Sequence, residues 1–332
     1  MRAVRLHETG GPKKLAVEEI ERPHPAPGEV LVRVSHAAFN HRDVYITQGL
    51  YPGIELPRTL GSDGCGEVAA LGEGVAGPAV GARVVINPML GWGDNARVWS
   101  DDASILGMPR EGTFAEYVAV PAANVFPKPA ALSDAEGAAL PLAGLTAYRA
   151  LITRGQLTPQ DTLLITGIGG GVQTFVLLFA KHIGARVVVT SSSDEKLERA
   201  KALGADECFN YRNNPEWHKA AKKFGIDIAV DSAGGETFAR VLDIVKPGGR
   251  VVTYGGTNGN ATIRPFSIFW KHLDVRGTSM GSPQDFAGML ACFEGGLRPA
   301  IDRIFPMDEA VAAAERLDGA GQFGKVVLKI SE

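Results

Sequence analysis

Leu163-Leu164-Ile165-Thr166-Gly167-Ile168-Gly169-Gly170-Gly171-Val172 is the stretch that decides the fold. An uncharged apolar segment ends in clustered glycines, and residues 172–183 then carry apolar side chains at steps of three and four. The first pattern predicts a strand, and the second predicts one face of a helix. Glycines in such a turn let the backbone approach a pyrophosphate, which the helix N-terminus also attracts. We therefore expect a dinucleotide site at Gly167, Gly169, Gly170, Gly171 and Val172, although Val172 or Gln173 replaces the third glycine of the usual fingerprint.

Composition places the chain among ordinary globular proteins. Its 332 residues are enough for two domains, and they are 45% hydrophobic and 21% charged. The net charge of −3 and the absence of a basic tract argue against nucleic acid or an anionic membrane as a partner. No signal peptide or membrane span is apparent, so a cytoplasmic location is expected. Three distant cysteines, Cys65, Cys208 and Cys292, exclude a disulfide framework and a Cys-rich metal knuckle.

The two halves of the chain differ in their predicted secondary structure. Residues 1 to about 140 are β-rich, with short strands expected at 30–34, 66–71 and 82–86 between Gly and Pro turns. The segment 87–111 is poorly patterned, and a loop of that length is typical of a functional region or its remnant.

Strands and helices alternate from about residue 144. This alternation predicts a parallel, doubly wound sheet with right-handed crossovers. A further helix at 307–317 and a strand at 324–330 end the chain. The strands are expected at 162–166, 185–190, 207–210, 226–231, 250–255 and 273–280, with helices that include 194–203 and 236–245.

The end of the second of these strands bears on the choice between NAD and NADP. A carboxylate there selects the ribose of NAD, whereas small polar residues with a cation nearby admit the 2′-phosphate of NADP. Ser191-Ser192-Ser193 follow the strand, and no carboxylate ends it. Ser191, Ser192, Lys196 and Tyr211, with Arg212 as a further candidate, therefore predict NADP(H). The alternative is that the serines form a polar turn and cap the helix that begins near Asp194.

Seven motifs together resemble the medium-chain dehydrogenase/reductase superfamily over essentially the whole chain. The resemblance implies an α/β fold: a GroES-like β-rich catalytic domain at 1–140, to which 286–332 return, and a doubly wound Rossmann NADP-binding domain at 141–285. It also implies a homodimer or homotetramer. The motifs begin at Pro27-Gly28-Glu29, Asn40-His41-Arg42-Asp43, Leu60-Gly61-Ser62-Asp63, Gly112-Thr113-Phe114, Gly144-Leu145-Thr146, Asp231-Ser232-Ala233 and Gly324-Lys325-Val326.

The positions that match metal ligands in this superfamily are occupied by other residues. Catalytic zinc is held there by a Cys, a His-Glu pair and a second Cys or Asp, and the matching residues are Asn40, Ser62-Asp63 and Leu142. An amide, a hydroxyl and an aliphatic chain do not replace thiolate and imidazole ligands. The loop that matches the structural-zinc lobe has no cysteine. We expect no metal, and the chain resembles the zinc-free quinone oxidoreductase-like branch, which it matches at Asn40, Asp43, Tyr45 and 49–52.

Without a Lewis acid, a substrate must itself spread the charge that hydride addition creates. Enones and quinones do so, which predicts an NADPH-dependent, zinc-independent oxidoreductase of quinones or α,β-unsaturated carbonyl compounds. Asn40 is expected to donate to the substrate carbonyl or to hold the nicotinamide ribose, and Tyr45 and Tyr51 are candidate proton donors. The superfamily match places Thr146 near the nicotinamide, and Gly255 and Gly256 would let backbone approach the cofactor.

Several alternatives stay open at this point. Tyr51 is either catalytic or a packed turn aromatic. His41 is a lone histidine that either relays a proton or has no such role, and Asp43 is expected to be a structural partner of a nearby backbone group or Arg. Trp92 and Trp99 either close over a substrate or fill space. The function is alternatively that of an enoyl-thioester or alkene reductase, of an alcohol dehydrogenase-like enzyme, or of a non-catalytic NADPH-binding structural or regulatory protein. Residues 268–280 are expected to form an apolar edge strand through which two copies associate.

Overall fold

The computed structural model describes residues 1–331, which divide into two compact units. Unit 1 comprises Met1–Ala143 and the chain from Ser282 onward, and unit 2 comprises Gly144–Gly281. The chain thus leaves unit 1 and returns to it, close to the boundaries expected at 140 and 286. Each unit has its own core of buried apolar side chains.

Unit 1 is built on a seven-stranded sheet with the order β10-β6-β5-β3-β18-β17, in which β9 also pairs with β3. Val30, Val32 and Val34 lie on one face of β3, at alternate positions, and belong to the buried core. A separate three-stranded sheet has the order β2-β1-β4. The strands of unit 1 are β1 (Arg2–Leu6), β2 (Leu15–Glu19), β3 (Glu29–Ala38), β4 (Arg58–Thr59), β5 (Asp63–Leu71), β6 (Arg83–Ile86), β7 (Met89–Leu90), β8 (Ser104–Ile105), β9 (Tyr117–Pro121), β10 (Val125–Pro127), β17 (Ile301–Pro306) and β18 (Lys325–Lys329).

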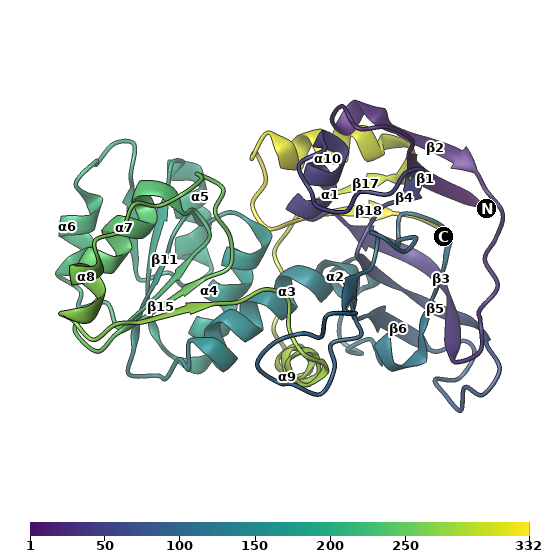
Figure 1. The fold of residues 1–332 in the computed structure, drawn as a ribbon, viewed down its shortest axis with the longest axis horizontal. Helices are drawn as coiled ribbons and strands as arrows, with labels where there is room; N and C mark the ends of the chain where they lie inside the picture. The colour runs from purple at the N-terminus through teal and green to yellow at the C-terminus, as the bar shows by residue number, and fades with distance from the viewer. Residues whose placement is uncertain (332) are drawn as a thin grey trace. The chain divides into compact units, whose positions relative to one another are not determined.

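The last strand of the chain lies inside this sheet, between β3 and the edge strand β17. β18 is antiparallel to β3, with Val327 opposite Ala38, and parallel to β17. Helix α10 packs against β18 and against α1, so the two ends of unit 1 share one core (Figure 1). The helices are α1 (His41–Gln48), α2 (Asp134–Ala139), α9 (Pro283–Glu294) and α10 (Ala310–Asp318), with short 3-10 turns at η1 (Pro12–Lys14), η2 (Ala122–Asn124) and η4 (Met307–Glu309).

The segment 87–111 folds as a lobe around the short β7–β8 hairpin. Asn124 Nδ2 donates to the backbone oxygens of Asn87 (2.9 Å) and Met89 (2.8 Å). The Trp92 side chain is buried and its Nε1 donates to Asn95 O at 2.9 Å, while its ring meets Trp99 edge-on. Trp92 therefore fills the lobe, which is the space-filling alternative of the sequence analysis.

Unit 2 contains a six-stranded, all-parallel sheet with the order β13-β12-β11-β14-β15-β16. Helices α6, α7 and α8 share a buried cluster with one face of the sheet, and α4 and α5 cover the other face (Figure 1). The elements are α3 (Pro141–Tyr148), which crosses the unit boundary, the π-helical turn η3 (Arg149–Arg154), β11 (Thr162–Ile165), α4 (Gly171–Ile183), β12 (Arg186–Ser191), α5 (Asp194–Ala202), β13 (Glu207–Asn210), α6 (Trp217–Lys222), β14 (Ile228–Asp231), α7 (Gly235–Ile244), β15 (Arg250–Thr253), α8 (Pro265–Phe269) and β16 (Asp274–Gly277).

The doubly wound fold expected from the sequence is confirmed. β11 and β14 are buried along their whole length, as expected for central parallel strands covered on both faces. The expected edge strand at 268–280 is wrong in extent, because Pro265 starts a helix that runs to Phe269 and only Asp274–Gly277 pair with β15. Among residues 1–331, no helix is both long and apolar enough to cross a membrane.

Candidate functional site

The glycine turn of unit 2 joins β11 to α4. Gly167 has φ 68° and Gly169 has φ 128°, backbone conformations that residues with a Cβ rarely adopt. Gly170 is the N-cap of α4, so the first amides of that helix, which have no intrahelical acceptor, point into the turn. A cradle of this kind, with Gly171 and Val172 as its first helical residues, fits a pyrophosphate.

The second strand holds the turn in place. Ile168 N donates to Thr190 O at 2.7 Å, and Gly167 N donates to Thr190 Oγ1 at 3.2 Å. Thr190 lies at the end of β12 and is buried. The sequence alone predicts Thr190 only as a strand residue, since its contact with the turn depends on the pairing of β11 with β12.

Gln173, at one of the two positions where the third glycine is missing, connects α4 to the end of β14. Its Nε2 donates to Ser232 Oγ at 2.5 Å, which ties the first turn of α4 to the end of β14. The neighbouring Thr166 Oγ1 donates to Asp231 Oδ1 at 2.6 Å, and Gly234 N donates to Asp231 Oδ2 at 2.9 Å. Burial raises the pKa of the Asp231 carboxyl above its usual value. Polar groups thus connect the carboxyl ends of β11 and β14, where dinucleotides bind in such sheets.

The residues expected at the 2′-phosphate lie beside this turn. A Cβ placed on Gly169 would stand 2.7 Å from Lys196 Cδ, so the Lys196 side chain runs across the glycine turn. Tyr211 N donates to Ser191 O at 3.0 Å, and the Tyr211 side chain is largely exposed. Ser192 lies between Ser191 and the first turn of α5 and is half-buried.

The serine cap, which is part of the alternative interpretation of the Ser191-Ser192-Ser193 turn, is also present. Ser193 is the N-cap of α5 and its side chain accepts from Lys196 N at 3.3 Å. Asp194 is held by Asn210 Nδ2 at 2.7 Å and Asn213 Nδ2 at 3.4 Å. A polar, capping turn therefore lies at the end of β12 beside the side chains predicted to bind a 2′-phosphate.

Three further predicted residues complete the description of unit 2. Gly255 and Gly256 follow β15, and Thr257 N donates to Ser232 O at 3.2 Å, which holds their loop at the carboxyl end of β14. Thr146 lies in α3 and is buried. The roles of these residues toward a nicotinamide stay predictions.

Unit 1 contains a buried polar cluster at Asn40, Asp63 and Lys325. Asn40 ends the chain segment that follows β3 and precedes α1, Asp63 begins β5, and Lys325 begins β18. Lys325 Nζ donates to Asn40 Oδ1 at 2.6 Å, Asp63 Oδ2 at 2.8 Å and Phe39 O at 2.8 Å. Asn40 Nδ2 donates to Asp63 Oδ2 at 2.9 Å, and Leu142 N donates to Asp63 Oδ1 at 2.7 Å. The Lys325 and Asp63 side chains are 2% and 0% exposed.

The structure thus brings together Asn40, Ser62, Asp63 and Leu142, the positions compared with zinc ligands. Their side-chain donors are one amide, one hydroxyl and one carboxylate, and the carboxylate is already paired with an ammonium group. Zinc prefers thiolate and imidazole ligands, so this set does not fit the metal. Within the described residues, no group of three or more His, Cys, Asp and Glu side chains is arranged to hold a metal ion.

Arg42 organises the neighbouring wall of the cluster. Its Nη1 donates to Ser62 Oγ at 2.7 Å and to Leu106 O at 2.8 Å, and its guanidinium carbon lies 4.8 Å from the centre of the Tyr51 ring. The Tyr51 ring also packs against the core of unit 1. Tyr51 is therefore a packed aromatic whose hydroxyl accepts from Arg42 Nε at 3.4 Å, and both interpretations of this residue retain support.

Helix α1 carries the remaining predicted residues. Asp43 Oδ2 accepts from Asn40 N at 2.8 Å, which confirms the structural role expected for Asp43. Burial raises the pKa of the Asp43 carboxyl to about 6. Tyr45 is half-buried, and the exposed His41 ring lies 6.3 Å from the Tyr45 ring. Arg42 and Lys325 were not predicted as site residues; the one available signal was a lysine directly before the apolar run Val326-Val327-Leu328.

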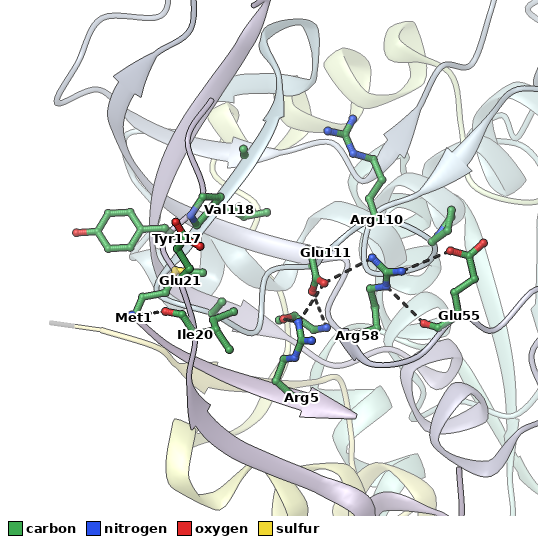
Figure 2. A pocket seen from close by; sticks show the side chains of 16 residues that line it. Met1, Arg5, Ile20, Glu21, Glu55, Arg58, Arg110, Glu111, Tyr117 and Val118 are labelled. Atoms are coloured by element: carbon green, nitrogen blue, oxygen red, sulfur yellow. Dashed lines mark hydrogen bonds and ion pairs between the residues drawn. The ribbon is translucent and has the colours of Figure 1, made fainter. Parts of the chain in front are cut away.

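A separate cavity of about 570 Å³ opens on another part of unit 1. Figure 2 shows Glu111 between Arg5 and Arg58, with Glu55 on the far side of Arg58. Arg5 Nη1 and Glu111 Oε1 lie 3.0 Å apart, and Arg58 pairs with both acidic residues. None of the predicted site residues lines this cavity, and four of its charged residues, Arg5, Arg58, Glu55 and Glu111, already pair with each other.

Two family models match the chain. The alcohol dehydrogenase GroES-like domain matches residues 26–130, and the zinc-binding dehydrogenase domain matches residues 171–295. A zinc-type alcohol dehydrogenase-like protein of Schizosaccharomyces pombe is 38% identical, with 99% of each chain covered. An acryloyl-coenzyme A reductase of Metallosphaera sedula is 32% identical (94% and 95% covered), and human quinone oxidoreductase is 28% identical (99% and 97% covered).

Solved structures show the same architecture. An NAD-dependent alcohol dehydrogenase is 39% identical and superposes with a TM-score of 0.94, with both chains fully covered. The 2-octenoyl-CoA carboxylase reductase CinF, solved with NADP and 2-octenoyl-CoA, is 26% identical with a TM-score of 0.91, covering 99% of this chain and 87% of that one. The relatives therefore differ among themselves in cofactor and substrate.

Proposed function

Because the chain belongs to the medium-chain dehydrogenase/reductase superfamily, whose matched relatives are oxidoreductases, we propose that it is a zinc-independent, NADPH-dependent reductase of quinones or α,β-unsaturated carbonyl compounds. The observation that carries the proposal is the donor set of the Asn40–Asp63–Lys325 cluster. Oxygens of Phe39, Asn40 and Asp63 already hold the ammonium group, and among residues 1–331 no group of three or more His, Cys, Asp and Glu side chains is arranged to hold a metal ion. The name of the S. pombe relative includes "zinc-type", so metal content is part of the test below.

The absence of suitable zinc ligands restricts the substrates that this chain would serve. Reduction of an isolated carbonyl creates an alkoxide, which needs strong local stabilisation. Reduction of an enone or a quinone creates an enolate or a hydroquinone anion, in which conjugation spreads the charge. A site that offers hydrogen bonds in place of a metal is therefore suited to the second class.

NADPH, when bound, supplies the hydride. Within unit 1, Asn40 Nδ2 has two hydrogens, and one of them is donated to Asp63. The second is available to a substrate oxygen or to a ribose hydroxyl. Tyr51 and Tyr45 remain candidates for the proton that completes the reduction, directly or through water.

The preference for NADPH is supported by Ser192, Lys196 and Tyr211. The cation and the small polar side chains at the end of β12 fit a 2′-phosphate, and no carboxylate ends that strand. Related proteins carry names with either cofactor, so this preference rests on the residues of this chain.

A second candidate function is reduction of an enoyl thioester. The 32% identity to an acryloyl-coenzyme A reductase favours it, and the chemistry is again hydride addition to a conjugated carbonyl. Both candidates use the same two units and differ in the group attached to the carbonyl.

We also propose that the chain associates through the edge of its parallel sheet. β16 pairs on one side only, with β15, and Val275 within it is 40% exposed. Phe266, Phe269 and Trp270 of the adjoining helical segment are also exposed, at 54%, 60% and 68%. An unpaired edge beside exposed aromatics favours a symmetric pairing of two copies.

The test is NADPH oxidation by the purified protein with a simple quinone, a cyclic enone, a short enoyl-CoA and the matching saturated ketone. Turnover of the quinone or the enone but not of the saturated ketone, with a zinc content well below one per chain, is the expected result. Preference for the enoyl-CoA supports the second candidate. Stoichiometric zinc, or tighter binding of NADH than of NADPH, contradicts the corresponding part of the proposal.

A further inference from the structure

Lys325 is a buried charged residue at the start of β18, directly before three buried apolar residues. The three residues after it in β18 are Val326, Val327 and Leu328, and all of them are buried. A buried ion pair contributes little to stability compared with a well-packed apolar pair, so stability alone gives no reason for a lysine at this position.

All three hydrogens of the Lys325 ammonium group have hydrogen-bond acceptors within unit 1. It has three hydrogens, and the three acceptors Phe39 O, Asn40 Oδ1 and Asp63 Oδ2 lie 2.6–2.8 Å from Nζ. Lys325 therefore has no hydrogen left for a substrate, and any effect it has on a reaction must pass through the groups that it holds.

Lys325 and Asp63 together determine the orientation of the Asn40 carboxamide. Its oxygen faces the ammonium at 2.6 Å, and its nitrogen faces the Asp63 carboxylate at 2.9 Å. Rotating the amide by half a turn would place its NH₂ against the ammonium and its oxygen against the carboxylate. Both contacts would then be repulsive, so the two buried charges fix which way the amide points.

We propose that Lys325 is a positioning residue, which fixes the direction of the second N–H of Asn40 and occupies, as an internal cation, the centre of the oxygen cluster. This inference rests on the proposed function in one respect, namely that Asn40 contacts a substrate or ribose oxygen. Asp63 is the counter-charge, held in turn by Leu142 N. The buried triad replaces a bound metal ion with a covalently attached ammonium.

The kinetic test compares Lys325→Met, Asn40→Ala and the double variant, with NADPH and a cyclic enone. Each single variant is expected to lower kcat/KM about tenfold or more, and the double variant to lose no more than the worse single one, because Lys325 acts through Asn40. Multiplied losses in the double variant overturn the proposal. Lys329→Met, at an exposed position of the same strand, is the matched control and should keep wild-type activity.

A stability test covers the case in which Lys325→Met folds poorly. Loss of the ammonium leaves Asp63 as an unpaired buried charge, so Tm should fall by on the order of 10 °C. Lys325→Met/Asp63→Asn removes both charges and should regain at least half of that fall. A double variant that is no more stable than Lys325→Met overturns the role of Asp63 as counter-charge.

Chemical rescue separates positioning from simple packing. Lys325→Ala leaves room at the cluster, and added methylammonium should raise both its Tm and its kcat/KM, whereas tetramethylammonium at equal ionic strength should not. Equal effects of the two ions overturn the proposal. If the wild-type protein reduces no enone or quinone, the proposed function fails. The Tm measurements on the Lys325 variants still show whether Lys325 is the internal cation.

Discussion

The side chain of Lys196 lies across Gly169: a Cβ on this glycine would stand 2.7 Å from Lys196 Cδ and 3.3 Å from its Nζ. Lys196 belongs to the first turn of α5, and Gly169 belongs to the turn before α4. A cation from one helix thus reaches the glycine turn that precedes another helix. This contact connects the pyrophosphate cradle with the residues that we assign to the 2′-phosphate.

Replacing Lys196 should therefore weaken NADPH more than NADH. Lys196→Ala removes a positive charge from the phosphate-binding region, and we expect the Kd for NADPH to rise on the order of tenfold or more, which corresponds to about 1.4 kcal/mol. The Kd for NADH should change less. Fluorescence titration with both dinucleotides measures this.

Lys201→Ala is the control for that experiment, because Lys201 lies in the same helix, is exposed and pairs with Glu198. It removes the same charge from a position without contact with the glycine turn. An equal loss of NADPH and NADH affinity in Lys196→Ala would contradict the 2′-phosphate assignment.

Gly169→Ala should damage both the turn and its cofactor site. The new methyl group meets Lys196, and the φ of 128° is unfavourable for alanine. We expect a loss of unfolding free energy of about 1–3 kcal/mol together with weaker binding of NADPH and NADH alike. Urea denaturation measures the unfolding free energy, and fluorescence titration measures the Kd for each dinucleotide.

Gly248→Ala distinguishes backbone strain from damage to the site. Gly248 also has a positive φ of 74°, but no atom lies within 4 Å of a Cβ placed there. The Gly248→Ala variant should have a lower unfolding free energy than the wild type but the same affinity for both dinucleotides. Unchanged affinity in Gly169→Ala would remove the turn from the cofactor site.

Asp43 predicts a pH dependence of stability. The usual pKa of this carboxyl is 3.8, and burial raises it to about 6 in the folded protein. Between these values the folded state binds more protons than the unfolded state, so the contribution of Asp43 to stability falls as pH rises through this window. The loss is complete above about pH 7 and amounts to something on the order of 3 kcal/mol.

Asp43→Asn keeps an oxygen for the backbone N–H of Asn40 but cannot ionise. The variant should therefore gain stability over the wild type between about pH 4 and pH 7, measured as the difference between their urea unfolding free energies at each pH. Taking the difference removes the contributions of the other carboxyl groups. A difference that stays constant with pH would show that Asp43 does not titrate in this range.

The proposed association predicts that charge on the sheet edge prevents it. Val275→Lys places an ammonium in the middle of β16, where edge pairing would bury it. We expect the wild type to be a dimer or a larger oligomer by light scattering and Val275→Lys to be smaller. Val80→Lys, at another exposed valine, is the control. A monomeric wild type would contradict the proposal.

The parallel sheet of unit 2 was predictable because its signals are local. The glycine turn, the uncharged apolar strands and the helical periodicity at 172–183 each lie within a short window, and the expected strand positions agree closely with β11–β15. The exception is the segment 268–280. Its apolar residues gave no separate signal for the helix that begins at Pro265 and the short strand that follows it.

The sequence by itself determined the alternating fold, the glycine turn and the kinds of side chain present where metal ligands would stand. Only the tertiary structure decided what replaces those ligands. Lys325 is 285 residues from Asn40 and 262 from Asp63 along the chain, and it reaches them because β18 pairs with β3, whose neighbour on the other side is β5. Periodicity describes neighbours along one element, whereas the meeting of three strands depends on how the whole sheet is ordered. The same ordering turns an unremarked lysine into the buried partner of Asp63.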